Sequence, residues 1–172
     1  MWARSHTGTL SFRPESLDIT ALVNSGIELI SVQAGRKNIS IIKDFGECRP
    51  ISGDVNMIGT ILRNLLVNAL KFTPRNGCIT VGISEEKSFC VLRVRDSGIG
   101  IASEKIDHLF NIDTPNKTKG TDQEAGSGLG LILCRELIEK HGGHIHVESE
   151  AGKGSEFRVF IPFGKTDAFP SK

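Results

Sequence analysis

The sequence lacks any apolar run near the roughly 20 residues of a membrane-spanning helix, and its first residues lack the apolar centre of a signal peptide. It also lacks an excess of charge of either sign, because 21 basic and 20 acidic residues leave a formal net charge of +1. A broad positive field for nucleic acid or for an anionic membrane is therefore excluded. We expect a water-soluble, cytoplasmic piece that contacts neither, and its parent protein could be membrane-anchored.

The sequence has no Cys-x-x-Cys pair. Its four cysteines are widely spaced: Cys48, Cys78, Cys90 and Cys134. This spacing argues against a structural zinc site and against a dense disulfide framework. We interpret all four as small core or surface residues of a protein in a reducing cytosol.

The length of 172 residues suits one folded domain and leaves no room for a second large one. An apolar fraction of 38% with 24% charged residues is ordinary for a globular protein and argues against disorder. We place the domain at residues 15–164. It lies between an N-terminal segment, 1–14, that reads as the end of a helix, and a C-terminal tail, 165–172.

Hydrophobic periodicity predicts an α+β fold. Long helices are expected over 18–37, 54–72 and 129–141, with a short one over 103–110. Strands are expected over 38–45, 78–84, 89–95, 144–149 and 156–161. The last four strands form two antiparallel hairpins joined by a crossover. We therefore expect a two-layer α/β sandwich, in which a mixed sheet of about five strands is covered on one face by about three helices.

A polar stripe runs along the predicted helix 54–72. Asn64, Asn68 and Lys71 are four and three residues apart and share one face. Apolar residues flank the stripe, so we expect both amides to be largely buried. A buried amide without partners costs about 1–3 kcal/mol, which calls for either a hydrogen-bonded core network or a polar ligand. An amide oxygen suits a hard cation such as Mg²⁺, and a lysine suits phosphate.

Two glycine-rich segments follow. Asp96, Gly98 and Gly100 combine a carboxylate with backbone that another molecule can approach closely, although ordinary turn chemistry explains the pattern equally well. The residues 126–130, Gly-Ser-Gly-Leu-Gly, open the predicted third helix, where free N–H groups and the helix dipole favour a phosphate. Their spacing is neither that of a Rossmann fingerprint nor that of a Walker A loop. The long polar stretch 111–126 before them is expected to be a functional lid or disordered.

The order of these pieces resembles the N, G1, F and G2 boxes of sensor histidine kinases. The matching segments are 64–74, 96–101, 109–110 and 126–131. The likeness continues through 139–143, 147–149 and 152–157, and residues 2–5 are similar to the end of the dimerisation helix that precedes this domain. Four motifs in register across nearly the whole chain are highly specific.

The resemblance implies the ATP-binding sandwich shared with gyrase, Hsp90 and MutL, with Mg²⁺ and a lid over the nucleotide. It implies that Asn68 coordinates Mg²⁺, that Lys71 meets phosphate, and that Asp96 accepts from the adenine amine. Asn64 stands where gyrase-like ATPases carry a water-activating glutamate, which fits phosphoryl transfer better than hydrolysis. The remaining implied binding residues are Phe72, Gly98, Gly100, Ile101, Phe110, Gly126, Ser127, Gly128, Leu129, Gly130 and Ser155.

The resemblance further implies a catalytic half of a two-component kinase. It would transfer the ATP terminal phosphoryl group to a histidine on dimerisation helices absent from this chain, because none of its five histidines stands in a phosphoacceptor motif. A receiver domain of a response regulator would act downstream, and a monomeric piece of a homodimeric parent is expected. Asn111 replaces a frequent basic residue, whose role would pass to Lys117 or Lys119 or be weakened. A non-catalytic ATP sensor and a gyrase-like ATPase are the alternatives.

Overall fold

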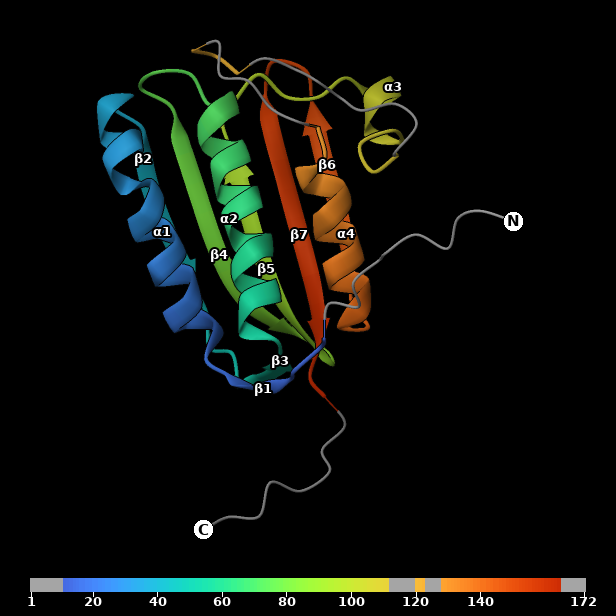
Figure 1. Cartoon of the computed structure of the whole chain (residues 1–172). Coiled ribbons are helices and arrows are strands. Elements are labelled where there is room, and N and C mark those ends of the chain that lie inside the picture. Colours follow the sequence, from blue (N-terminus) through green and yellow to red (C-terminus); the bar gives the residue numbers. More distant parts are fainter. Residues whose placement is uncertain (1–10, 112–119, 123–127, 165–172) are drawn as a thin grey trace.

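Helices and strands form two layers in the computed structural model, which describes residues 11–111, 120–122 and 128–164. Five strands make one mixed sheet in the order β2-β4-β5-β7-β6. Helices α1, α2 and α4 lie side by side on one face of this sheet (Figure 1). The predicted α+β two-layer sandwich is therefore confirmed.

The elements alternate along the chain much as the periodicity predicts. The helices are α1 (Ile19–Arg36), α2 (Val55–Phe72), α3 (Ser103–Ile106) and α4 (Gly130–Lys140). The sheet strands are β2 (Ser40–Phe45), β4 (Cys78–Glu86), β5 (Phe89–Asp96), β6 (His144–Glu150) and β7 (Gly154–Pro162). A separate two-stranded ribbon pairs β1 (Glu15–Leu17) with β3 (Ile51–Gly53).

Aspartate caps set where the two longest helices begin. The Asp18 carboxylate accepts from the N–H groups of Thr20 and Ala21, and the Asp54 carboxylate accepts from those of Asn56 and Met57. Each cap satisfies N–H groups that have no partner inside the helix. The predicted starts at 18 and 54 are thus the cap positions themselves.

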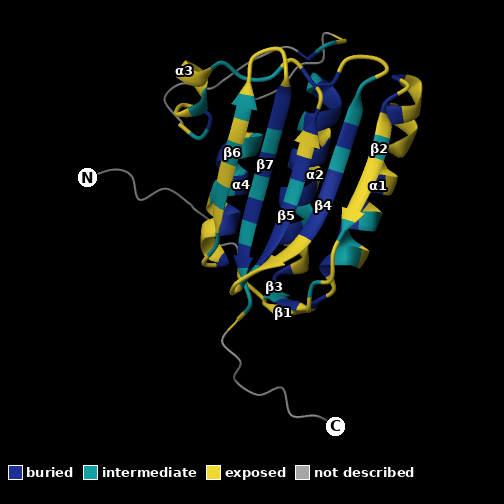
Figure 2. Ribbon diagram, turned by 180° about the vertical axis from the view of Figure 1, so that it is seen from behind, coloured by how far each residue is buried: buried dark blue, intermediate teal, exposed yellow. Residues whose placement is uncertain are grey.

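The sheet register decides which side chains reach the helices. Strands β2 and β4 pair in parallel, and the other neighbours are antiparallel. Alternate residues of β4, β5 and β7 face the helix layer and form the core with the buried faces of α1, α2 and α4. Figure 2 shows the opposite face of the sheet, which is exposed along β2 and alternates along β6. The site-bearing ends of β5 and β7 lie in the middle of this sheet.

Two predictions about elements need correction. The ribbon strands β1 and β3 were not predicted, because three residues are too few to show a period of two. The short helix ends at Ile106 instead of continuing to residue 110, and turns follow it. In the part of the chain that the structure describes, no helix is both long and apolar enough to cross a membrane.

Candidate functional site

A cavity of about 380 Å³ opens between α2, the loop after β5 and the start of α4. Its volume lies within the range of ligand pockets, about 300–1,000 Å³. The fold brings together in its wall the residues that the sequence singles out in α2, in the loop after β5, at the start of α4 and in β7. These are Asn64, Asn68, Lys71, Phe72, Asp96, Gly100, Ile101, Gly128, Gly130 and Ser155.

Asp96 ends β5 and is buried in the cavity wall. The N–H of Gly98 donates to its Oδ1 at 2.8 Å. Burial raises the pKa of this carboxyl to about 6, while backbone hydrogen bonds from Gly98 and Ser155 act in the opposite direction. Because burial dominates, the ionised carboxylate lacks part of the solvation it would have in water. A hydrogen-bond donor entering the cavity would restore it.

The glycine-rich loop after β5 is wedged against the β6–β7 turn. Gly100 adopts a φ of +66°, and a Cβ at this position would collide with the carbonyl of Glu150. A Cβ at Gly98 would stand 2.4 Å from the carbonyl oxygen of Phe72, so a side chain fits at neither position. The glycines of this segment are therefore required by contacts within the protein, and the loop presents Ile101 to the cavity.

Ser149, the last residue of the matching segment 147–149, ties this loop to β7. Its Oγ accepts from the N–H of Ile101 at 2.8 Å and donates to the carbonyl of Gly154 at 2.8 Å. It also lies 2.9 Å from Oγ of Ser155, which is a register partner of Asp96. The two serines and Asp96 form one row across three strands, and Asp96 and Ser155 of this row line the cavity.

The polar stripe of α2 faces the cavity. The Nδ2 of Asn64 donates to the carbonyl of Thr60 at 2.9 Å. Its Oδ1 lies toward Gly130, where a Cβ would stand 2.6 Å from that oxygen. Asn64 and Asn68 are mostly buried, as expected, and keep a partial exposure because they line an open cavity. Lys71 is buried, and its Nζ lies 4.8 Å from the ring centre of Phe72.

The C-terminal end of α2 is held by two residues that the sequence did not single out. The buried Nζ of Lys37 donates to the carbonyl of Leu70 at 2.9 Å and to Oγ1 of Thr121 at 2.8 Å. The N–H of Thr121 donates to the carbonyl of Lys71 at 3.0 Å. These bonds anchor the chain at Thr121 beside the cavity residues of α2, and contacts so distant in sequence leave no local signal.

The start of α4 points its first turn at the cavity. Gly128 and Gly130 line it, and Gly128 has a φ of +74°. The N-cap residue Leu129 makes no side-chain hydrogen bond to the first turn. Among the described residues no side chain caps this end of α4, and the N-terminal end of a helix suits an anion.

Several predicted residues are not in the cavity wall. Gly98 packs against the carbonyl of Phe72, and Leu129 is exposed. The ring of Phe110 lies 5.7 Å from the guanidinium of Arg135. Four others lie outside the described residues, as does most of the expected lid: Lys117, Lys119, Gly126 and Ser127. Asn111, at the edge of the described range, has its Nδ2 3.2 Å from Nδ1 of His108.

The cavity wall also includes residues that were not predicted to contribute. They are Val67, Ala69, Ile99, Ala102, Lys105, Leu109, Leu131 and Phe157. Most are apolar, and four of them lie within the matching segments 96–101, 109–110, 126–131 and 152–157: Ile99, Leu109, Leu131 and Phe157. Lys105 is different, because it brings a cation to the rim from α3. Within the described ranges, no group of three or more His, Cys, Asp or Glu side chains could hold a metal ion.

Comparison with known proteins agrees with this geometry. A family model described as histidine kinase-, DNA gyrase B- and HSP90-like ATPase matches residues 53–165. The sensor histidine kinase ZraS of Escherichia coli (strain K12) is 32% identical over 157 residues, which cover 91% of this chain and 32% of ZraS. The chain spans about a third of the length of these curated relatives.

Solved structures share the fold. The catalytic domain of histidine kinase ThkA, in a nucleotide-free form, matches with a TM-score of 0.74 and 28% identity, over 90% of this chain and 97% of that one. Full-length ShkA in complex with AMPPNP matches with a TM-score of 0.78 and 29% identity, over 94% of this chain and 33% of that one. A complex of ThkA with the response regulator protein TrrA matches with a TM-score of 0.74 at 25% identity, over 88% of this chain and 42% of that one.

Proposed function

The chain belongs to the family of histidine kinase-, DNA gyrase B- and HSP90-like ATPases and is a catalytic ATP-binding domain of the two-component sensor histidine kinase type, and we propose that it transfers the terminal phosphoryl group of ATP to a histidine on a separate dimerisation domain. The observation that carries this proposal is the cavity, whose wall combines the buried carboxylate of Asp96 with the amides of α2, a buried lysine and the glycines at the N-terminal end of α4. Such a cavity suits a ligand with a hydrogen-bond donor at one end and anionic groups at the other.

We assign the adenine end of the site to Asp96. Its carboxylate would accept from the exocyclic amine, and Ser155 would support the same end through water. The apolar residues Ile101, Leu109 and Phe157 line the cavity and would contact the base. This assignment explains why a carboxylate with a raised pKa is kept buried, since a charge-assisted bond to the amine offsets its desolvation.

We assign the phosphate end to the α2 stripe and the start of α4. The N–H groups at Gly128 and Gly130 and the ammonium of Lys71 would hold phosphate oxygens. Asn68 fits a Mg²⁺ ligand, because the ion prefers oxygen and is usually held by few protein groups together with water and substrate phosphates. When bound, Mg²⁺ would neutralise part of the charge on the transferring group. Lys117, Lys119 and the rim residue Lys105 are candidate cations for the terminal phosphate.

Asn64 supports transfer to a histidine over hydrolysis. An amide cannot take a proton from water, so this position supplies no general base. Its Nδ2 is committed to Thr60, which leaves Oδ1 to face the cavity side at Gly130. A histidine nucleophile needs no such base when its reacting nitrogen is unprotonated.

The proposed context is a homodimeric sensor kinase with a response regulator downstream. Residues 1–14 would be the remnant of its dimerisation helix and linker, 15–164 the catalytic domain and 165–172 a tail. The known complex of ThkA with a response regulator supports this context. A cytoplasmic place for the domain follows from the same proposal, because the receiver domain and ATP are available there.

The test is reconstitution with a purified phosphoacceptor helix pair from the parent kinase. With Mg²⁺ and ATP labelled on its terminal phosphate, label is expected on the helix pair and not on this chain. A helix pair whose acceptor histidine is replaced by glutamine is the control. ATP binding without transfer would favour an ATP sensor, and steady phosphate release without the helix pair would favour a gyrase-like ATPase.

A further inference from the structure

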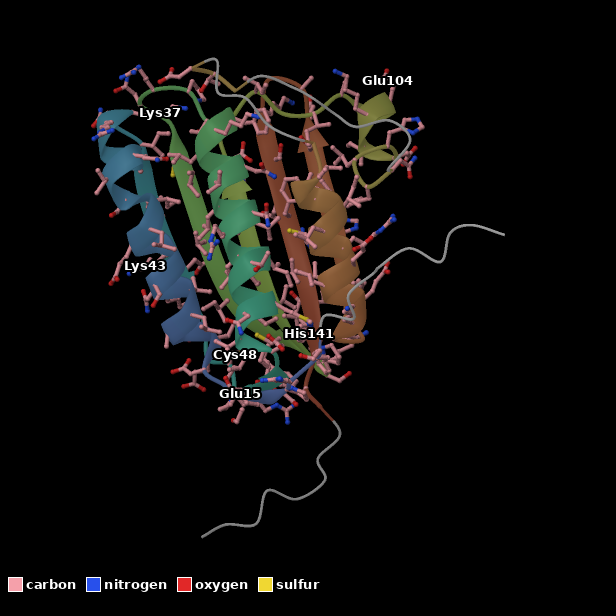
Figure 3. All side chains as sticks on the ribbon, in the orientation of Figure 1. Glu15, Lys37, Lys43, Cys48, Glu104 and His141 are labelled. Carbon is pink, nitrogen blue, oxygen red and sulfur yellow. The ribbon has the colours of Figure 1, made fainter. Side chains whose placement is uncertain are left out.

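Two cysteines far apart in sequence meet at the end of the sheet away from the cavity. Cys48 lies in the connection between β2 and β3, and Cys90 is the second residue of β5. Their Sγ atoms are 2.9 Å apart. Figure 3 shows Cys48 at the end of the molecule that also carries Glu15 and His141, whereas Lys37 and Glu104 lie at the other end.

This separation is unusually short for two thiols. Even carbon atoms, which are smaller than sulfur, have their optimal contact at about 3.5–4.0 Å. A disulfide bond is about 2.0 Å long, so the two sulfur atoms need to approach by only about 0.9 Å more to be bonded. The other cysteines lie elsewhere: Cys78 at the far end of β4, and Cys134 in α4 with its thiol 3.9 Å from the carbonyl of Ile61.

We propose that Cys48 and Cys90 are a redox modification site that forms a reversible intramolecular disulfide. Cys48 is partly exposed and can be reached by a small oxidant, whereas Cys90 is buried directly behind it. This arrangement assigns the two roles. Cys48 is the thiol that attacks the oxidant first, and Cys90 is the resolving thiol that no bulky reagent can reach.

The oxidant is a low-molecular-weight disulfide such as oxidised glutathione. The Cys48 thiolate attacks one of its sulfur atoms, so a mixed disulfide forms and one small thiolate leaves. The Cys90 thiolate then attacks the sulfur of Cys48 and displaces the second small thiolate. Overall, the protein loses two electrons and two protons, and the small disulfide is reduced to two thiols.

The surroundings make this reaction slow in its first step and specific in its second. Burial raises the pKa of the Cys48 thiol. The hydrogen bond with Cys90 and the charge of Arg49 oppose this rise, and the Glu85 and Asp18 carboxylates add to it. Burial also raises the pKa of Cys90. Few thiolates are therefore present at neutral pH, and oxidation should accelerate as the pH rises. Once Cys48 carries a mixed disulfide, its closest thiol is the one already in contact with it.

The disulfide would hold the connection between β2 and β3 against the central sheet. Cys48 stands three residues before Ile51, which pairs with Leu17 in the β1–β3 ribbon. The nucleotide cavity is far from this bond, because Asp96 lies six residues along β5 and a strand rises about 3.3 Å per residue, or roughly 20 Å in all. Oxidation should therefore stiffen the ribbon through which the N-terminal segment enters the domain, and it should leave ATP affinity unchanged.

The experiment oxidises the full chain with oxidised glutathione at pH 8 and counts free thiols under denaturing conditions. The count is expected to fall from the four cysteines of the sequence to two, and peptide mapping should link Cys48 to Cys90. Crosslinking a loop of this size should raise the midpoint of thermal unfolding by about 5–15 °C, and a reducing agent should reverse the rise. Amide hydrogen exchange of Ile51 and Leu17 should slow in the oxidised form.

Matched variants separate this site from general thiol oxidation. Cys48→Ser should keep three thiols and show no rise in the unfolding midpoint, whereas the double variant Cys78→Ser, Cys134→Ser should form the bond as the natural chain does. A persistent glutathione adduct on Cys48, a bond to Cys78 or Cys134, or a bond between two chains would overturn the proposal. ATP titration of the oxidised chain keeps this result separate from the phosphoryl-transfer proposal, because the affinity is expected to be the same in both redox forms.

Discussion

The substitution Asp96→Asn tests whether the carboxylate of Asp96 accepts from the adenine amine, because it replaces only one oxygen of the side chain. Gly98 N–H donates to Oδ1 of Asp96 at 2.8 Å, so an asparagine would keep its own oxygen there. Its NH₂ group would then take the place of the other carboxylate oxygen. In the proposed complex this puts a donor opposite the donor amine of adenine, and the hydrogen bond is lost together with the charge.

The structure sets the size of two opposite effects. A charge-assisted hydrogen bond is worth about 1.5–3 kcal/mol, so the dissociation constant for ATP should rise about 10- to 150-fold. The free protein should behave differently. Its buried carboxyl has a pKa of about 6 instead of 3.8, which corresponds to about 3 kcal/mol of unfavourable free energy in the ionised form. Removing that charge should stabilise the nucleotide-free domain by up to this amount, or by up to roughly 6–12 °C in its unfolding midpoint.

Calorimetric titration with Mg-ATP and thermal unfolding without nucleotide measure the two effects on the same samples. Asp18→Asn is the matched control, because an asparagine oxygen can still cap α1 and Asp18 lies outside the cavity wall. Weaker binding with an equal or higher unfolding midpoint would support the assignment. Unchanged ATP affinity would refute it, and so would weaker binding accompanied by a lower midpoint, since that would indicate damage to the fold.

Three further predictions follow from single contacts. ATP affinity should fall about tenfold between pH 7 and pH 5, because Asp96 takes up a proton below its pKa of about 6. Since this pKa is higher in the folded protein than in the unfolded chain, the contribution of Asp96 to the free energy of unfolding should grow as the pH falls from about 6 toward 3.8. Both trends should vanish in Asp96→Asn. Gly100→Ala should lower the free energy of unfolding by about 2–4 kcal/mol, because its φ is +66° and the added Cβ would collide with Glu150. The control Gly152→Ala is strained at a φ of +83° but lies in open space, so it should lower the free energy of unfolding by only about 1–2 kcal/mol. Equal losses for the two variants in chemical denaturation would contradict the collision. Thr121→Val should lower the free energy of unfolding by about 1–3 kcal/mol, because it removes a hydrogen-bond acceptor from the buried ammonium of Lys37. Thr121→Ser keeps a hydroxyl acceptor and should retain the stability of the natural chain. If urea unfolding shows no loss for Thr121→Val, this anchor is not formed in solution.

Much of the fold follows from local patterns. The starts of α1 and α2 follow from aspartates placed directly before apolar helical periods, and those caps act within three residues. The ends of β5 and α4 were predicted to within one residue for the same reason. Where the prediction failed, as for β1 and β3, the strands exist only because two short segments pair with each other. A contact across 36 residues has no trace in either segment alone.

The site divides in the same way. The stripe of α2, the carboxylate at Asp96 and the glycines before α4 are visible as residue types at fixed spacing, and the resemblance to histidine kinases orders them. What they touch is not visible. The partial exposure of Asn64 and Asn68, the bonds of Ser149 and the burial of Lys37 depend on neighbours from other strands and helices.

The sequence by itself determined the two layers, the positions of the long helices and the kind of ligand, because these depend on periodicity, capping and residue chemistry over a few neighbouring positions. Only the tertiary structure decided that Asp96 is buried enough to hold its proton up to about pH 6, and that Cys48 and Cys90 lie in contact. The physical reason is common to both. Desolvation and contact depend on distance in space, and parts of the chain 42 residues apart meet only when the sheet has formed.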